Sequence, residues 1–260
     1  MKKHLLASVA CTALVAAPAM AADMPVKAPP PPVVFTWTGC YLGANAGYGW
    51  SRSDTATTLT SNFSAVAAQP IFNAIMSPTL HPKGGIAGGQ IGCNYQAGNF
   101  VFGAETDYSY FHLTDSVVTS GTPPANATLT STTAVSTDWL WTGRLRVGVA
   151  VDRALFYVTG GIATTRLNYS QVNSFTPCAF NPTGICTEAV ATSATKAGWT
   201  AGGGVEYAVT NNWTVKAEYL YADFGSISTV GADDSVRSPF FHNANLKVST
   251  ARVGINYLFK

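Results

Sequence analysis

The feature that most constrains the fold of this chain is a period of two in its large apolar side chains. In eight segments of roughly 10 to 15 residues, apolar or aromatic side chains fall at every second position, as in membrane-spanning strands. Such alternation predicts β-strands with one apolar and one polar face. We expect these strands at residues 38–51, 84–97, 99–113, 138–151, 154–168, 197–210, 212–224 and 246–259.

The connections between these segments alternate in length. Residues 97–99, 152–154 and 211–212 are tight turns, whereas stretches rich in Ser, Thr, Asn and Pro cover 52–83, 114–137, 169–196 and 225–245. Outer-membrane barrels combine an even number of strands with short periplasmic turns and long external loops. The chain is therefore expected to form an all-β, eight-stranded antiparallel up-and-down transmembrane β-barrel. It would have four long external loops and both chain ends in the periplasm.

Charged residues collect on one face of the predicted strands. In the third segment, Glu105 and Asp107 lie opposite Phe102 and Tyr108. An Arg or Lys facing lipid near the bilayer midplane costs about 2–4 kcal/mol, so a barrel wall requires this segregation. An eight-stranded barrel has room inside only for side chains, so we expect the charges to pair and fill the lumen. The predicted lumen charge network contains Glu105, Asp107, Arg144, Arg146, Glu206, Lys216, Glu218 and Arg252.

The fifth segment is ambiguous in phase. Phe156, Val158 and Ile162 compete with Leu155 and Tyr157 for the outward face. We favour the first set as the outward one.

The composition supports a surface in contact with lipid. Only 11% of the residues are charged, against about 25% in soluble domains. A soluble β-sandwich would bury the same alternating face, but it leaves the aromatic residues at the strand ends unexplained. These match the aromatic girdles found at headgroup level. The predicted girdle consists of Trp50, Trp139, Trp141, Trp199, Trp213 and Tyr221.

The N-terminus resembles a secretion signal. Lys2 and Lys3 precede an apolar stretch from Leu5 to Ala17, and Ala19 and Ala21 fit a signal-peptidase site. We expect a signal peptide at residues 1–21 and a Pro-rich periplasmic tether at 22–34. The barrel would then occupy 35–260, in the outer membrane of a Gram-negative bacterium. No later stretch is long and apolar enough for a membrane helix.

Four cysteines follow the predicted leader, and an oxidising periplasm would allow them to pair. Cys40 and Cys93 fall at similar depth on neighbouring strands, and Cys178 and Cys186 share one predicted loop. We favour these two pairs, although four cysteines permit three connectivities. No Cys-x-x-Cys pair supports a zinc site.

The sequence contains no convincing set of catalytic residues. His112 has Asp107, Ser109 and Asp115 nearby, which are the residue types of a hydrolase. Loops rich in Ser and Thr produce such neighbours by chance, and no Gly-x-Ser-x-Gly motif is present. We expect no catalytic, cofactor-binding or metal-binding residues. A net charge of +2 without a basic patch indicates no nucleic-acid partner.

Several sequence blocks carry a family resemblance. The first is WTGCYLGANAGYGW at residues 37–50, and the others lie at residues 88–96, 103–107, 144–148, 157–163, 202–207 and 252–259. Together they resemble the alphaproteobacterial outer-membrane immunogenic protein family, or porin-family small surface antigens. The resemblance spans nearly the whole chain after the leader, and it implies a barrel similar to the membrane domain of outer-membrane protein A.

The resemblance implies a structural surface protein that serves envelope integrity and surface contact. Its expected partners are outer-membrane lipid and lipopolysaccharide, host or matrix ligands at the external loops, and the barrel-assembly machinery. Tyr257 and Phe259 form the expected C-terminal assembly signal, although Lys260 follows them. The alternatives are a small-solute porin and a haem- or ligand-binding barrel. Haem would be held through His81, His112 or His242.

Overall fold

The computed structural model describes residues 35–59, 69–122, 128–177, 183–232 and 239–259. The chain from Phe35 onward forms one compact unit. The predicted signal peptide and tether therefore lie outside the described residues, as do Cys178 and Lys260.

Almost every described element is a strand. The helix α1 (Gln69–Ile75) is the exception among the described residues. No helix in the described ranges is long and apolar enough to cross a membrane. The strands are β1 (Gly39–Leu59), β2 (Thr79–Leu80), β3 (Lys83–Ala97), β4 (Phe100–Phe111), β5 (Thr114–Gly121), β6 (Thr128–Val151), β7 (Ala154–Thr176), β8 (Cys186–Ala208), β9 (Trp213–Ala232) and β10 (Pro239–Phe259).

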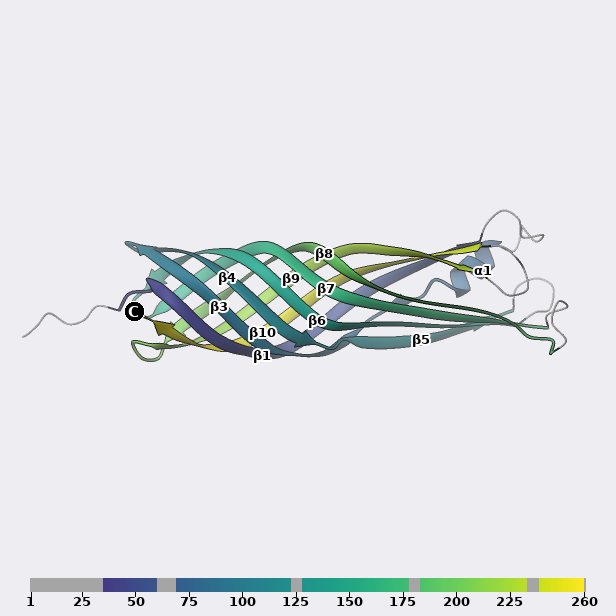
Figure 1. Ribbon diagram of the computed structural model, residues 1–260, viewed down its shortest axis with the longest axis horizontal. Helices are drawn as coiled ribbons and strands as arrows, with labels where there is room; N and C mark the ends of the chain where they lie inside the picture. The colour runs from purple at the N-terminus through teal and green to yellow at the C-terminus, as the bar shows by residue number, and fades with distance from the viewer. Residues whose placement is uncertain (1–34, 60–68, 123–127, 178–182, 233–238, 260) are drawn as a thin grey trace, which may run out of the picture. The chain divides into compact units, whose positions relative to one another are not determined.

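Eight of these strands close into an antiparallel ring. The order is β1-β10-β9-β8-β7-β6-β4-β3, and pairing of β3 with β1 closes it. The short strands β2 and β5 pair beside β1 and β6 and are additional to the ring. Figure 1 shows the ring strands winding around a common axis, and several of them continue toward α1. The predicted eight-stranded up-and-down barrel is confirmed, with two short extra strands.

The register fixes the inclination of the strands. Direct cross-strand partners lead from Trp50 once around the ring to Cys40, which lies ten residues nearer the N-terminus on β1. With a rise of about 3.3 Å per residue and strands about 4.7 Å apart, this stagger corresponds to a tilt of roughly 40°. Such a tilt is typical of outer-membrane barrels.

The strands extend much further than the sequence pattern predicted. β6 begins at Thr128 instead of residue 138, β7 ends at Thr176 instead of 168, and β8 begins at Cys186 instead of 197. The predicted long loops are therefore largely strands, and the segment 52–83 also contains α1. We call the part of the barrel formed by the added strand residues the extension; it comprises residues 52–59, 79–80, 114–121, 128–137, 169–176, 186–196, 225–232 and 239–245. The extension lies at the end of the barrel opposite the tight turns. In outer-membrane barrels this end is the external one.

The Thr and Ser side chains of the extension favour β-strands that close into a barrel. Thr has high β-propensity, and its hydroxyl can satisfy a backbone carbonyl inside the barrel. Ser53 Oγ donates to the Asn245 carbonyl at 2.6 Å, and Thr55 Oγ1 donates to the Pro78 carbonyl at 2.6 Å. The prediction of loops from these Thr and Ser residues was wrong for most of the four stretches.

The fifth predicted segment turns the favoured set outward. Phe156, Val158 and Ile162 are exposed on the outer face of β7, whereas Leu155 and Tyr157 are buried in the lumen. The outer wall is thus apolar at these positions, as a lipid-facing surface requires.

Candidate functional site

The lumen is the candidate site, because the sequence analysis placed its charged residues there. Its periplasmic end is closed by an apolar cluster around Trp37, which is 1% exposed, with Phe35 packed against it. The ring of Phe35 lies edge-on to that of Trp37, with 5.0 Å between the ring centroids. The other members of this cluster are Val101, Ala150, Leu155, Tyr157 and Ala208.

Above this cluster lies an ionic layer centred on Arg144. Its guanidinium contacts Glu105 at 2.5 Å, Asp107 at 3.0 Å and Glu218 at 2.8 Å. The Arg144 side chain has no exposed surface. One cation thus joins three carboxylates that come from β4 and β9, in a medium where ion pairs are only weakly screened.

The remaining charges extend this layer into one connected network. Arg252 bridges Asp107 at 2.8 Å and Glu218 at 2.5 Å, and Lys216 contacts Glu105 at 2.9 Å. Arg146 contacts Glu206 at 2.9 Å. The structure therefore brings together all eight residues of the predicted lumen charge network.

Tyrosine side chains that were not part of the predicted network complete it. Tyr41 Oη donates to Glu105 at 2.6 Å, and Tyr157 Oη donates to Glu218 at 3.1 Å. The guanidinium of Arg146 lies 4.9 Å from the Tyr41 ring centroid and 5.2 Å from that of Tyr157. Such cation–π contacts stabilise a desolvated cation. The position of both tyrosines on the polar face of their strands was the available sequence signal.

A hydrophobic layer fills the lumen on the external side of the charges. Its largest members include Phe111, Leu113, Leu246 and Tyr169, each no more than 2% exposed, together with Phe224. The alternation pattern did not predict this layer, because it predicts an inward face that is polar throughout. The sequence signal for this layer was the presence of large apolar side chains at inward positions of β4, β9 and β10.

A buried polar cluster follows inside the extension. The two ring nitrogens of His242 contact Gln171 Oε1 and Glu188 Oε1, each at 2.9 Å. Asn173 Nδ2 donates to Glu188 Oε2 at 2.5 Å, and Tyr169 Oη donates to Gln171 Oε1. Burial raises the pKa of Tyr169 above its ordinary value. His242 lies on β10 and is 1% exposed, whereas the predicted stretch 225–245 made it part of an external loop.

Helix α1 caps this cluster at the external end. Phe72 and Met76 pack on Leu129 and Phe240, and all four side chains are buried. The Met76 carbonyl accepts hydrogen bonds from Gln171 Nε2 at 2.8 Å and from Thr57 Oγ1 at 3.0 Å. The cap is therefore tied to the polar cluster beneath it.

The predicted girdle residues divide between two belts on the outer wall. Five of them lie where β1, β6, β8 and β9 pass into the extension: Trp50, Trp139, Trp141, Trp199 and Tyr221. The ring centroids of Trp50 and Tyr219 are 6.2 Å apart. Trp213 lies at the opposite end, 5.1 Å from Tyr257. The two belts bracket the apolar band expected of a spanning barrel.

Most of the other predicted residues lie apart from the lumen, whereas Cys186 is 1% exposed on the inward face of β8. Cys40 and Cys93 form a disulfide between β1 and β3 on the outer face, and Cys186 is also disulfide-bonded. Tyr257 and Phe259 of the expected assembly signal face outward at the periplasmic end. His81 and His112 are exposed, and His112 stacks on Tyr110 at 6.0 Å.

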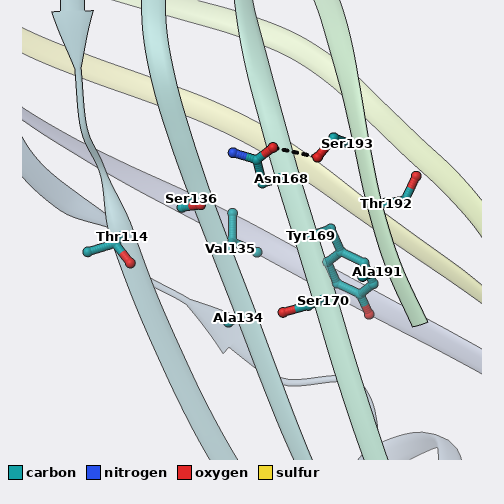
Figure 2. Close-up of a pocket in the computed structure, with 10 residues that line it drawn as sticks. All are labelled: Thr114, Ala134, Val135, Ser136, Asn168, Tyr169, Ser170, Ala191, Thr192 and Ser193. Atoms are coloured by element: carbon teal, nitrogen blue, oxygen red, sulfur yellow. Dashed lines mark hydrogen bonds between the residues drawn. The ribbon is translucent and has the colours of Figure 1, made fainter. Parts of the chain in front are cut away.

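A shallow hollow of about 290 Å³ runs along β5 to β8 in the extension. Figure 2 shows Asn168 on β7 directed toward Ser193 on β8, which donates to it at 2.6 Å. Asn168 Nδ2 also contacts both carboxylate oxygens of Asp138 at 3.1 Å. Asn168, Ser193 and Asp138 therefore satisfy one another at this hollow.

A closed ring with an apolar exterior and an ion-paired interior defines an integral outer-membrane β-barrel. Residues 7–259 match the family described as the outer membrane protein beta-barrel domain, and the chain belongs to this family.

Curated relatives agree with this assignment. The chain is 38% identical to the 31 kDa outer-membrane immunogenic protein of Brucella melitensis over 270 residues, covering 100% of both chains. It is 26% identical to the 25 kDa outer-membrane immunogenic protein of Brucella abortus over 249 residues, covering 94% of this chain and 92% of that protein. Neither relative is named as an enzyme. The chain is thus a protein of the outer membrane.

A solved structure with a similar fold is the outer membrane protein OprG from Pseudomonas aeruginosa. The two chains are 10% identical, with a TM-score of 0.45, and the match covers 86% of this chain and 98% of that one.

Proposed function

We propose that this protein is a non-conducting structural barrel that supports the integrity of the envelope and carries its extension above the outer membrane for surface contact. The filled lumen is the observation that carries this proposal. Apolar, ionic, apolar and polar layers follow one another along the barrel axis, and α1 closes the external end. A porin requires a continuous aqueous path, and these layers are packed with buried side chains.

Energetics support a permanently closed lumen. Removal of one partner from a buried ion pair costs about 3–5 kcal/mol, because the other charge stays uncompensated. Arg144 contacts three carboxylates at once, so side-chain movement that opened a path would break several such contacts together. The network is therefore suited to joining the strands of the wall and poorly suited to gating.

The extension supports the role in surface contact. Its outer face carries mainly small side chains, such as those of Thr132, Ala191 and Ser193. A strand-built extension is stiffer than free loops, so it would present a fixed surface to host or matrix ligands. Loops positioned by a rigid scaffold are where binding residues concentrate.

Planar-bilayer recordings on the refolded protein test the closed lumen. We expect no stable conductance steps from the wild-type protein, under conditions in which a general porin gives them. Stable steps that vanish when Arg144 and Glu105 are both changed would show that solutes pass through the network, and the proposal would fail.

Growth of a deletion strain tests the structural role. Loss of the protein should increase sensitivity to detergents and large antibiotics, and the wild-type gene should restore resistance. A strain without any permeability defect would contradict the role in envelope integrity while leaving the closed lumen unaffected.

A further inference from the structure

A group of basic residues lies on the outer wall beside Trp50. Arg52 on β1 and Lys247 on β10 are direct cross-strand partners, and both side chains are exposed. Lys83 on β3 is the cross-strand partner of Trp50. We call Lys83, Arg52 and Lys247 the basic cluster. Like charges directly opposite each other destabilise a sheet, unless an anion lies between them.

The acids near this cluster balance it only in part. Arg52 Nε contacts Asp54 Oδ1 at 3.0 Å, and Asp223 is the cross-strand partner of Lys247. Burial acts to raise the pKa of Asp54, but hydrogen bonds from Arg52 and Thr79 lower it below the ordinary value. The Arg52 side chain remains 66% exposed. Three cations thus face two carboxylates.

The position of the cluster matches the headgroup layer. Trp50, which is 43% exposed, belongs to the external aromatic belt, and aromatic belts lie at headgroup level. Arg52 and Lys247 lie one step further from the apolar band on their strands. They therefore face the zone where lipid phosphates are found.

An apolar groove lies on β1 and β10, which carry two of these basic residues, and extends across β9 to β8. It has a volume of about 680 Å³ and is lined by Ala44, Ala46, Val205, Ala217, Val253 and Ile255. The register places Ala217 directly between Val253 and Val205, so a small side chain stands between larger ones. The groove is recessed into a wall whose other outward side chains are mostly large.

The groove and the basic cluster are aligned at a distance that suits one lipid molecule. Ala46 is six residues from Arg52 on β1, and Val253 is six residues from Lys247 on β10. Six residues span about 20 Å along a strand, and a tilt of roughly 40° makes this about 15 Å of depth. This depth is half of the 30 Å hydrocarbon core and thus about one leaflet.

We propose that the basic cluster and the groove form one binding site for an acylated, phosphate-bearing lipid of the outer leaflet, of the lipopolysaccharide class. Arg52 and Lys247 hold the phosphate, Lys83 lies on the other side of Trp50, and an acyl chain lies in the groove beside Ala217. The site is on the outer wall and does not depend on whether the lumen conducts.

Binding of lipid A to the refolded protein in nonionic detergent tests the site. Diphosphoryl lipid A should bind at least about tenfold more tightly than its dephosphorylated form, because charge-assisted hydrogen bonds to phosphate are lost in the latter. Inorganic phosphate alone should not compete. Native mass spectrometry measures the bound fraction, and heat-modifiable migration on gels verifies that each variant is folded.

Three variants separate the parts of the site. The double variant Arg52→Gln/Lys247→Gln should lose the preference for the phosphorylated lipid. Ala217→Phe fills the groove, so it should weaken the binding of both lipids by the same factor. Arg166→Gln is the matched control, because Arg166 lies at similar height on β7 across the ring and pairs with Asp138 at 3.8 Å. It should bind both lipids like the wild-type protein.

Three results would overturn the proposal. The first is equal affinity for the two lipids, and the second is an equal loss in Arg166→Gln, which would indicate a general charge effect. The third is a wild-type dimer that Ala217→Phe dissociates while lipid binding stays unchanged. That result would make the groove an interface between two copies of the chain.

Discussion

Among single residues, Arg144 illustrates how the lumen charges act on stability. It contacts Glu105, Asp107 and Glu218, and neither it nor they are accessible to solvent. Arg144→Gln leaves these carboxylates without their shared cation, so we expect the free energy of unfolding in detergent to fall by about 3–5 kcal/mol. Urea titration followed by tryptophan fluorescence measures this loss.

An exposed ion pair provides the comparison for this prediction. Arg166 and Asp138 are 3.8 Å apart with half-exposed side chains, and such pairs contribute less than about 1 kcal/mol. Arg166→Gln should therefore leave the unfolding midpoint nearly unchanged. Similar losses in the two variants would mean that Arg144 is not buried as the structure shows.

The alternation of side chains along each strand predicted which charged residues face inward, but it could not predict which of them form ion pairs. Partners such as Arg252 and Asp107 lie on strands far apart in sequence, and their contact depends on the stagger of the whole ring. The pairing of His242 with Glu188 was missed for another reason. Glu188 lies in a Ser- and Thr-rich stretch, where one acid gives no signal of an inward face.

Among the elements, α1 should be the part that opens most easily. It is seven residues long, and it is held by the contacts of Phe72 and Met76 and by the hydrogen bonds to the Met76 carbonyl. Met76→Ala removes a buried side chain, at a cost of about 2–5 kcal/mol. Because this cost falls on a short capping element, we expect local opening. Hydrogen exchange at residues 69–76 should accelerate at least tenfold, while exchange in β4 stays unchanged.

A uniform acceleration in both regions would show that the cap and the barrel unfold as one unit. Ile71→Ala is a suitable control variant, because Ile71 is 43% exposed on the same helix. It should leave exchange at the cap nearly unchanged.

The lengths of the strands were the least predictable feature of the fold. Strand positions within the apolar band were predicted within a few residues, as for β3, which covers Lys83–Ala97 against a prediction of 84–97. Beyond that band the outer face carries mostly small side chains and few large apolar ones, such as Val118 and Val230, so the regular alternation of large apolar and polar side chains disappears. Inward Thr and Ser residues such as Thr133 and Ser131 then have the composition of a loop. Only pairing with neighbouring strands shows that they are β-structured.

For the whole molecule, strand length and membrane thickness together define two zones. β6 has 24 residues, which at a tilt of roughly 40° span about 60 Å along the axis. The hydrocarbon core is about 30 Å thick, so about half of β6 lies outside it. The aromatic belts place the spanning half at the end with the tight turns.

Spin labels along the outer face of β6 can locate the boundary between these zones. Labels at Leu145 and Val149 should collide more with oxygen than with a water-soluble nickel chelate, because both positions face lipid. Labels at Ser136 and Thr132 should show the reverse, since they lie beyond the belt at Trp139. Continuous-wave power saturation in liposomes measures both collision rates. High oxygen and low nickel accessibility at Thr132 would place the extension inside the bilayer, and the assignment of an extracellular β-structured part would then be wrong.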